Sequence, residues 1–259
     1  MQILTSTYSV SRVCLVAAFL LANLIPRLVH AKEGPGSIWG VNAKNQIFLW
    51  SGDGWRQIAG ELKYVSASAD GAVWGVNSKD EVFKWTGNSF TPVGDGTLSQ
   101  ISVGNPKSIW GVNARNQVFL WTGDGWRQVA GKLKYVSASA DGAVWGVNSK
   151  DEVFRWTGNS FTPVGDGTLS QISVGNPRNI WGVNAKNQIF TWTGDGWRQI
   201  AGELKHVSAS ADGAVWGVNS KDEVFRWTGN SFTPVPNGSL KQISVGKSRG
   251  GHTVKKRAK

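Results

Sequence analysis

The chain has 259 residues, a formal net charge of +11, 15 tryptophans, one cysteine and three histidines. A single cysteine excludes a disulfide framework, and so few cysteines and histidines leave no cluster for a zinc site. The length is sufficient for a sizeable hydrophobic core without such cross-links.

The first segment, residues 1–31, has the pattern of a secretory signal peptide. Arg12 precedes an apolar run from Val13 to Ile25, and the small residue Ala31 marks the expected cleavage point. The run is about a dozen residues long, whereas a membrane-spanning helix needs roughly 20. We therefore expect a secreted, extracellular protein with no transmembrane span after cleavage. An uncleaved anchor is the alternative.

Between the ends, a short motif that begins as Ile38-Trp39-Gly40-Val41-Asn42 is repeated along residues 32–246. Its tryptophans are spaced 35 or 36 residues apart, at Trp39, Trp74, Trp110, Trp145, Trp181 and Trp216. A fixed period in this range indicates a propeller, a solenoid or another repeat array.

Each repeat contains four short runs of β-branched and aromatic residues, separated by Gly, Asn and Asp, which is the pattern of strands and turns. In one repeat the predicted strands are Tyr64–Ser68, Ala72–Val76, Glu81–Trp85 and Phe90–Val93. Ile47 and Phe48 are adjacent and both apolar, so both faces of a sheet are expected to pack against neighbours. We predict an all-β fold, a six-bladed β-propeller of four-stranded antiparallel blades.

The two ends of the repeat region complement each other. The first repeat begins at Ser37, which corresponds to the second strand of a unit, and Leu240–Val245 supplies the missing first strand. We predict that this C-terminal strand joins the N-terminal blade and closes the ring, which removes open sheet edges.

Odd and even repeats also differ from each other, so the longer period of 71 residues predicts approximate threefold symmetry.

The last segment, residues 247–259, contains six cations, no anion and no apolar periodicity. Such a composition is typical of a disordered basic tail. Without these cations and the two arginines of the signal peptide, the net charge falls from +11 to +3. The repeat region itself is close to neutral, so we do not predict nucleic-acid binding.

The repeat resembles that of the tectonin family. The matching residues are Trp39-Gly40-Val41-Asn42, then Ile47-Phe48, then Trp55-Arg56-Gln57-Ile58, with equivalents in every unit, although Phe90 replaces the last tryptophan in the even units. This family includes slime-mould and fungal tectonins, a lipopolysaccharide-binding horseshoe-crab tachylectin and fish-egg lectins. The resemblance implies a propeller lectin that binds glycans, in some members methylated sugars.

The candidate ligand-binding residues belong to the turn that precedes the fourth strand. In odd units these are Trp55, Trp126 and Trp197 with Asp53, Asp124 and Asp195, and in even units Asn88, Asn159 and Asn230. An indole face can cover the apolar face of a sugar while a carboxylate accepts hydrogen bonds from its hydroxyl groups. The alternative is that these tryptophans only cap the edge of a blade. We expect the six motif tryptophans to be core residues.

Two rims of the ring compete as the binding surface. The Gly-Asp-Gly turns share one rim with most of the tryptophans, and we favour this rim. The turns of the Asn77–Asp80 type share the other rim, where their polar residues also fit ordinary turn chemistry. Three sites are expected if the odd-unit tryptophan matters, and six if all units bind. Asn237-Gly238-Ser239 is a candidate N-glycosylation site.

The sequence offers little for catalysis. After signal removal only His206 and His252 remain, and near-identical repeats provide no singular constellation of acid, base and nucleophile. We therefore predict no enzyme activity, no cofactor and no metal.

We expect a secreted, monomeric, multivalent lectin with an agglutinating or innate-defence role. Its partners are glycans or lipopolysaccharide on cell surfaces, including methylated sugars or bacterial envelope glycans. Two alternatives remain. One is recognition of lipopolysaccharide or anionic lipid through the basic tail. The other is a propeller that binds proteins rather than sugars.

Overall fold

A computed structural model describes residues 37–247. The predicted signal peptide, 1–31, and the predicted tail beyond Lys247 lie outside the described residues. Within the described range, no helix has the length and apolar character needed to cross a membrane.

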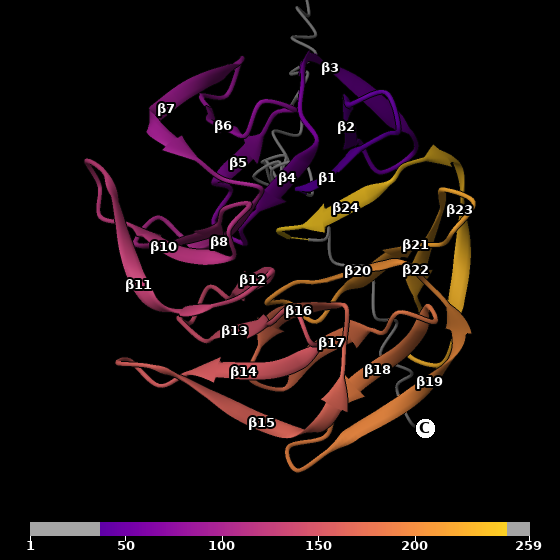
Figure 1. The fold of residues 1–259 in the computed structure, drawn as a ribbon. Coiled ribbons are helices and arrows are strands. Elements are labelled where there is room, and N and C mark those ends of the chain that lie inside the picture. Colours follow the sequence, from indigo (N-terminus) through magenta and orange to yellow (C-terminus); the bar gives the residue numbers. More distant parts are fainter. Residues whose placement is uncertain (1–36, 248–259) are drawn as a thin grey trace, which may run out of the picture. The chain divides into compact units, whose positions relative to one another are not determined.

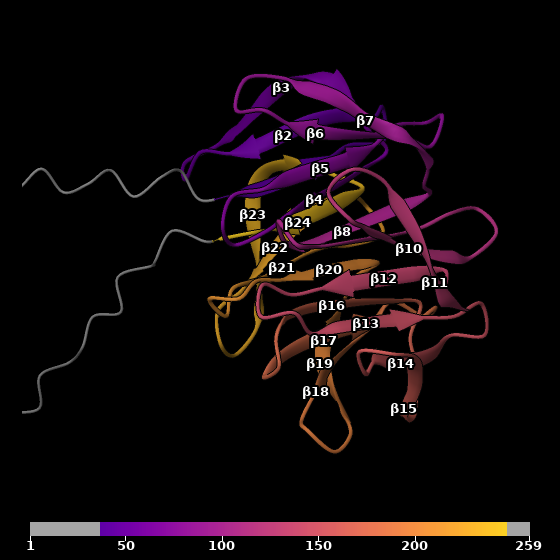
Figure 2. The same ribbon diagram turned by 90° about the vertical axis from the view of Figure 1, so that its left-hand side faces the viewer.

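The described residues form six four-stranded antiparallel sheets, each a blade (Figure 1). Blade 1 contains β24 (Gln242–Val245), β1 (Ile38–Val41), β2 (Gln46–Trp50) and β3 (Trp55–Glu61); blade 2 contains β4 (Tyr64–Ala67), β5 (Val73–Val76), β6 (Glu81–Trp85) and β7 (Phe90–Thr97); blade 3 contains β8 (Gln100–Asn105), β9 (Ser108–Val112), β10 (Gln117–Trp121) and β11 (Trp126–Lys132); blade 4 contains β12 (Tyr135–Ala138), β13 (Val144–Val147), β14 (Glu152–Trp156) and β15 (Phe161–Thr168); blade 5 contains β16 (Gln171–Asn176), β17 (Asn179–Val183), β18 (Gln188–Trp192) and β19 (Trp197–Glu203); blade 6 contains β20 (His206–Ala209), β21 (Val215–Val218), β22 (Glu223–Trp227) and β23 (Phe232–Ser239). Strands β24, β4, β8, β12, β16 and β20 surround the axis, as Figure 1 shows. Figure 2 gives the side view, in which β12 to β15 of blade 4 follow one another toward the bottom of the picture. The predicted six-bladed propeller is confirmed.

Ring closure by the C-terminal strand is also confirmed. β24 pairs with β1, so that Gly40 lies opposite Ile243 and Trp39 opposite Ser244. Glycine at position 40 permits this close approach, because an added Cβ would lie 2.4 Å from Cδ1 of Leu240 and displace it. The first blade is therefore built from both ends of the repeat region.

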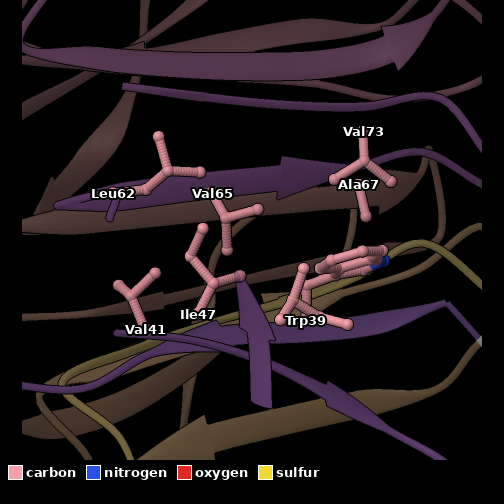
Figure 3. Packing of buried hydrophobic residues seen from close by; sticks show 8 residues of the cluster. Trp39, Val41, Ile47, Leu62, Val65, Ala67 and Val73 are labelled. Atoms are coloured by element: carbon pink, nitrogen blue, oxygen red, sulfur yellow. The ribbon is translucent and has the colours of Figure 1, made fainter. Parts of the chain in front are cut away.

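The hydrophobic core is divided among the blade junctions. Ile47 points toward Val65 of blade 2, as Figure 3 shows, whereas its neighbour Phe48 packs on the opposite face against blade 6. This is the two-sided burial that their adjacent apolar positions predict. The six motif tryptophans are also core residues, none of them more than 5% exposed.

Hydrogen bonds between the inner strands link all six blades. One serine in each inner strand accepts the backbone N–H of the next blade's inner strand at 2.8 or 2.9 Å: Ser244 from Ala67, Ser66 from Val103, Ser102 from Ala138, Ser137 from Val174, Ser173 from Ala209 and Ser208 from Val245. The chain of bonds returns to its starting blade, so the closed ring is stabilised by a closed cycle of inter-blade contacts.

The outer strands of the even blades are longer than the sequence indicates. We expected the strand at Phe90 to end at Val93, but β7 continues to Thr97, and β15 and β23 extend equally. A register shift allows this extension, since Thr97 pairs with Glu81 and Pro92 with Phe83. The extension places the residues between Val93 and Thr97 beside the next blade.

Candidate ligand grooves between the blades

The tryptophans predicted to contact ligand lie where an even blade meets the following odd blade. Trp126 is paired with Trp121 across a hairpin, with ring centroids 5.2 Å apart, and lies 6.4 Å from Trp74 of the preceding blade. The equivalent clusters contain Trp145, Trp192 and Trp197, and Trp50, Trp55 and Trp216. Trp55, Trp126 and Trp197 are each half-buried.

A glycine of the preceding blade packs against the edge of each of these three indoles. A Cβ on Gly96 would lie 2.4 Å from Cδ1 and 2.8 Å from Nε1 of Trp126, and Gly167 and Gly238 have the same role beside Trp197 and Trp55. The three indole N–H groups are buried and find no hydrogen-bond partner within residues 37–247. The N–H edge of each ring therefore belongs to the blade packing, and only the remaining ring surface can meet a ligand.

This close contact predicts the effect of adding one methyl group. We expect Gly96→Ala to displace the Trp126 ring and to lower the free energy of unfolding by roughly 1–3 kcal/mol, as overpacking usually does. Gly125→Ala is the matched control, because a Cβ at Gly125 would meet no atom within 4 Å. Urea unfolding and the near-ultraviolet circular dichroism of the tryptophans measure both effects. Equal stability of the two variants would contradict the packing role of Gly96.

Two of the junctions form equivalent grooves. Groove 1, between blades 2 and 3, has a volume of about 410 Å³, and groove 2, between blades 4 and 5, has a volume of about 450 Å³. Groove 1 is lined by Asp95, Asn113, Phe119, Asp124 and Trp126. Groove 2 is lined by the residues 71 positions later, Asp166, Asn184, Phe190, Asp195 and Trp197. These volumes are in the range of small-ligand sites.

Each groove brings two carboxylates together with two aromatic rings. Asp124 is oriented by the Thr122 hydroxyl, which donates to Oδ1 at 2.7 Å, and the bond from Thr193 lowers the pKa of Asp195. Asp95 and Asp166 are exposed, and the side chain of neither makes a hydrogen bond or ion pair to another described residue. The carboxylates can therefore accept hydrogen bonds from a ligand whose apolar face rests on the aromatic rings.

The third junction, between blades 6 and 1, has a different composition. Pro236 and Asn237 replace Gly94 and Asp95 of blade 2. Gly94 has φ 63°, a value that proline cannot adopt, and in blade 6 the positive φ moves to Asn237, at 59°. Asn237 is exposed. This junction thus has Asp53 but lacks a second carboxylate at the position of Asp95.

A family model described as the tectonin domain matches residues 27–123, 108–195 and 174–255, which together include all described residues. The chain belongs to the tectonin family. No curated protein matches this tectonin. Among solved structures, the WD40 β-propeller domain of Doa1 is similar, with 12% identity, a TM-score of 0.58, and coverage of 82% of this chain and 86% of that one.

Two further solved structures are similar in fold. U3-55K is 11% identical, with a TM-score of 0.56 and coverage of 77% of each chain. The RRP9 WD40 repeats are 11% identical, with a TM-score of 0.56 and coverage of 77% of this tectonin and 76% of that chain. At such identities the likeness shows the fold alone. Tectonin propellers are typically non-enzymatic, and this fold in general supports a lectin or a protein-interaction propeller.

The even-unit candidates lie apart from the grooves of this tectonin. Asn88, Asn159 and Asn230 are exposed in the turns between the third and fourth strands of the even blades, and they line neither groove 1 nor groove 2. The structure therefore groups Asp124 and Trp126 with Asp95, and Asp195 and Trp197 with Asp166, and leaves these asparagines at separate positions.

The opposite rim of the tectonin ring is occupied by turn contacts. Asn77 accepts the N–H groups of Lys79 and Glu81 at 2.9 and 3.0 Å, and its amide donates to the Glu81 carboxylate at 2.6 Å. The asparagines of the other five turns make the same backbone contacts. Because each groove also includes one of these asparagines, Asn113 or Asn184, the grooves combine residues from both rims.

The axis of the propeller is closed by Tyr64, Tyr135 and His206. The Tyr135 hydroxyl contacts that of Tyr64 and lies 3.2 Å from Nε2 of His206. The adjoining cavity has a volume of about 40 Å³, which is too small for a sugar. Residues 37–247 contain no group of three or more His, Cys, Asp or Glu side chains that could hold a metal ion.

Asp95, Asp166, Phe119 and Phe190 are groove residues that the sequence did not identify as candidates. A signal was present, because the Gly-Asp-Gly sequence at Asp95 and Asp166 becomes Pro-Asn-Gly at Asn237. A difference confined to one copy of a near-perfect repeat marks a position where the copies have different surroundings or roles.

Proposed function

We propose that this tectonin is a secreted, monomeric lectin that binds glycans in grooves 1 and 2. The observation that supports this proposal is that the same five side chains line two grooves of similar volume. Carboxylates that accept hydroxyl hydrogen bonds, beside half-buried aromatic rings, match the chemistry of a sugar. Cell-surface glycans, including those of bacterial envelopes, are the proposed targets, and agglutination in innate defence is the proposed role.

Two sites on one rigid ring explain how weak sugar contacts become useful. Linked sites can raise avidity by roughly 10²–10⁴ when both engage one repetitive surface. The proposal includes no catalysis, because the buried His206 faces an axial cavity of only about 40 Å³.

The difference between the junctions predicts two sugar sites per chain instead of three or six. A glycan array selects the sugar, and calorimetry with that sugar counts the sites. We expect Asp95→Ala with Asp166→Ala to weaken binding at least about tenfold, since hydrogen bonds to charged groups contribute about 1.5–3 kcal/mol each. Asp53→Ala, which removes the carboxylate that corresponds to Asp124 at the third junction, is the control and should leave the affinity unchanged.

A gain of function completes this test. We expect Pro236→Gly with Asn237→Asp to raise the stoichiometry from two sites to three, because it restores the groove 1 sequence. The stoichiometry is measured on protein produced in bacteria, so that Asn237 carries no glycan. Glycosylation at Asn237 is tested separately, by the intact mass of protein secreted from eukaryotic cells. An array without signal would overturn the lectin proposal. Binding lost on removal of residues 248–259 would favour recognition of anionic lipid or lipopolysaccharide by the tail.

A further inference from the structure

The residue before each inner strand occupies the same place in all six blades. These residues are Lys63, Ser99, Lys134, Ser170, Lys205 and Lys241, and the backbone N–H of each donates to the end of the neighbouring strand at 2.8 Å. Their side chains lie at the rim opposite the Gly-Asp-Gly turns, beside the turn between the second and third strands. The six positions can therefore be compared directly.

In five blades this position is electrically balanced. Each lysine of the even blades forms an ion pair with an aspartate of the adjacent turn: Lys63 with Asp80, Lys134 with Asp151 and Lys205 with Asp222. In blades 3 and 5 a serine replaces the lysine and an asparagine replaces the aspartate. The hydroxyl groups of Ser99 and Ser170 donate to the carbonyl oxygens of Val112 and Val183 at 2.9 Å.

Blade 1 breaks this rule. It combines the lysine of the even blades with the asparagine of the odd blades, and Nζ of Lys241 lies 2.5 Å from Oδ1 of Asn45. The amide oxygen accepts a hydrogen bond but does not neutralise the ammonium charge. Lys44, exposed in the same turn, adds a cation that has an equivalent in every blade, and Glu61, paired with Gln46 across the hairpin, adds a carboxylate. The excess positive charge arises where the two ends of the repeat region meet.

The blades on either side increase this excess. Lys241 is half-buried, and its pKa is lowered first by burial and then by the charge of Lys63, an effect to which Lys205 adds and which Asp222 opposes. Because Lys63 and Lys205 are each paired with one carboxylate, the group of Lys63, Lys205, Lys241, Asp80 and Asp222 has one unbalanced positive charge. An anion placed there would offset it.

We propose that the rim around Lys241, between Lys63 and Lys205, is a binding site for a tetrahedral oxyanion of the phosphate type. Lys241 and Lys44 supply cations that form no ion pair with another described residue, and Lys63 and Lys205 supply further N–H donors. A free phosphate ion and a phosphomonoester on a larger molecule share this chemistry. The site differs from grooves 1 and 2 in residues and in location, so it does not rest on the proposed sugar binding.

The test uses inorganic phosphate and the full chain at low ionic strength, where surface charges are least screened. Side-chain NMR of the lysines follows the titration. We expect phosphate to shift the Lys241 signal and to raise its pKa, with saturation by one ion. Absence of both changes at Lys241 would overturn the proposal. Glucose 6-phosphate and glucose form two further arms, which show whether a phosphomonoester binds and whether the sugar alone does.

Two substitutions use the symmetry of the ring. Lys241→Ser introduces the residue found in blades 3 and 5, and we expect it to weaken phosphate binding about tenfold, or about 1.4 kcal/mol. Lys107→Ser, which removes an exposed cation of the other rim, is the matched control and should have little effect. Ser99→Lys places a lysine beside Asn116 and between two lysine-bearing blades, so it should create a second phosphate site.

The outcomes separate a built site from general charge. Equal losses in Lys241→Ser and Lys107→Ser would show that phosphate responds only to net charge, and would overturn the proposal. The cations of residues 247–259 are present in every variant, so their contribution cancels. Asp95→Ala with Asp166→Ala should retain phosphate binding even if glycan binding fails, which keeps the two proposals distinguishable.

Discussion

A chain that ends at Ser239 is expected not to fold into a stable propeller. This truncation removes β24, the first strand of blade 1, together with the buried Leu240, Ile243 and Val245. Truncating one such side chain to alanine typically costs about 2–5 kcal/mol, and the stability of a whole domain is about 5–15 kcal/mol. Loss of all three, with the pairing to β1, therefore costs about as much free energy as the whole stability of a domain. Circular dichroism and thermal unfolding should show no cooperative transition.

The control is a chain that ends at Lys247, which retains β24 and removes only residues 248–259. We expect its unfolding transition to match that of the full chain. The two truncations differ by eight residues, so a large difference between them isolates the closing strand. A cooperative transition of normal midpoint in the shorter chain would contradict the closure mechanism, because it would show that the remaining blades are stable with an open edge at β1.

The fold could be predicted because the sequence repeats every local signal. The spacing from Trp39 to Trp74 defines the blade, and the shift in frame between Ser37 and Leu240 indicates closure. Adjacent apolar residues such as Ile47 and Phe48 indicate that both faces of each sheet are covered. These features depend on period and alternation, and both can be read without knowing which blades touch.

The grooves could not be predicted in the same way. Gly94, Asp95 and Gly96 have low strand propensity, so the outer strand was expected to end at Val93. The structure extends β7 through them with a shifted register, and Asp95 thereby reaches the groove that Asp124 and Trp126 also line. Such a meeting depends on how one blade is placed against the next. The sequence pattern within one blade does not contain that information.

The cluster of Tyr64, Tyr135 and His206 at the propeller axis could be predicted only in part. The repeat alignment places His206 at the position of Tyr64 and Tyr135, so its exceptional identity is evident from sequence. Only the closed ring shows that the three side chains meet, with ring centroids 6.1 to 6.5 Å apart. It also shows that Nδ1 of His206 is buried and has no hydrogen-bond partner among the described residues. A histidine exposed at the surface would not make stability depend on pH in this way.

Burial of His206 makes the stability of the propeller depend on pH. Burial, with a smaller effect of Lys205, lowers the pKa of His206 to about 3 from 6.5. The unfolded chain therefore binds a proton as the pH falls below 6.5, whereas the folded protein does not until about pH 3. The contribution of neutral His206 is present above pH 6.5 and is lost as the pH falls. The resulting loss in the free energy of unfolding is about 1.4 kcal/mol per pH unit, or about 2.5 kcal/mol between pH 7 and pH 4.5.

The variant His206→Gln isolates this effect, because glutamine can contact Tyr135 but does not titrate. Urea unfolding at several pH values between 7 and 4.5 should show that the wild type loses about 2.5 kcal/mol more than the variant. Carboxylates titrate in both proteins and cancel in the difference. Parallel stability curves would contradict the mechanism. NMR titration of His206 in the wild type provides a second measurement, and protonation in the folded protein above pH 5 would exclude it, because the imidazole would then charge without unfolding.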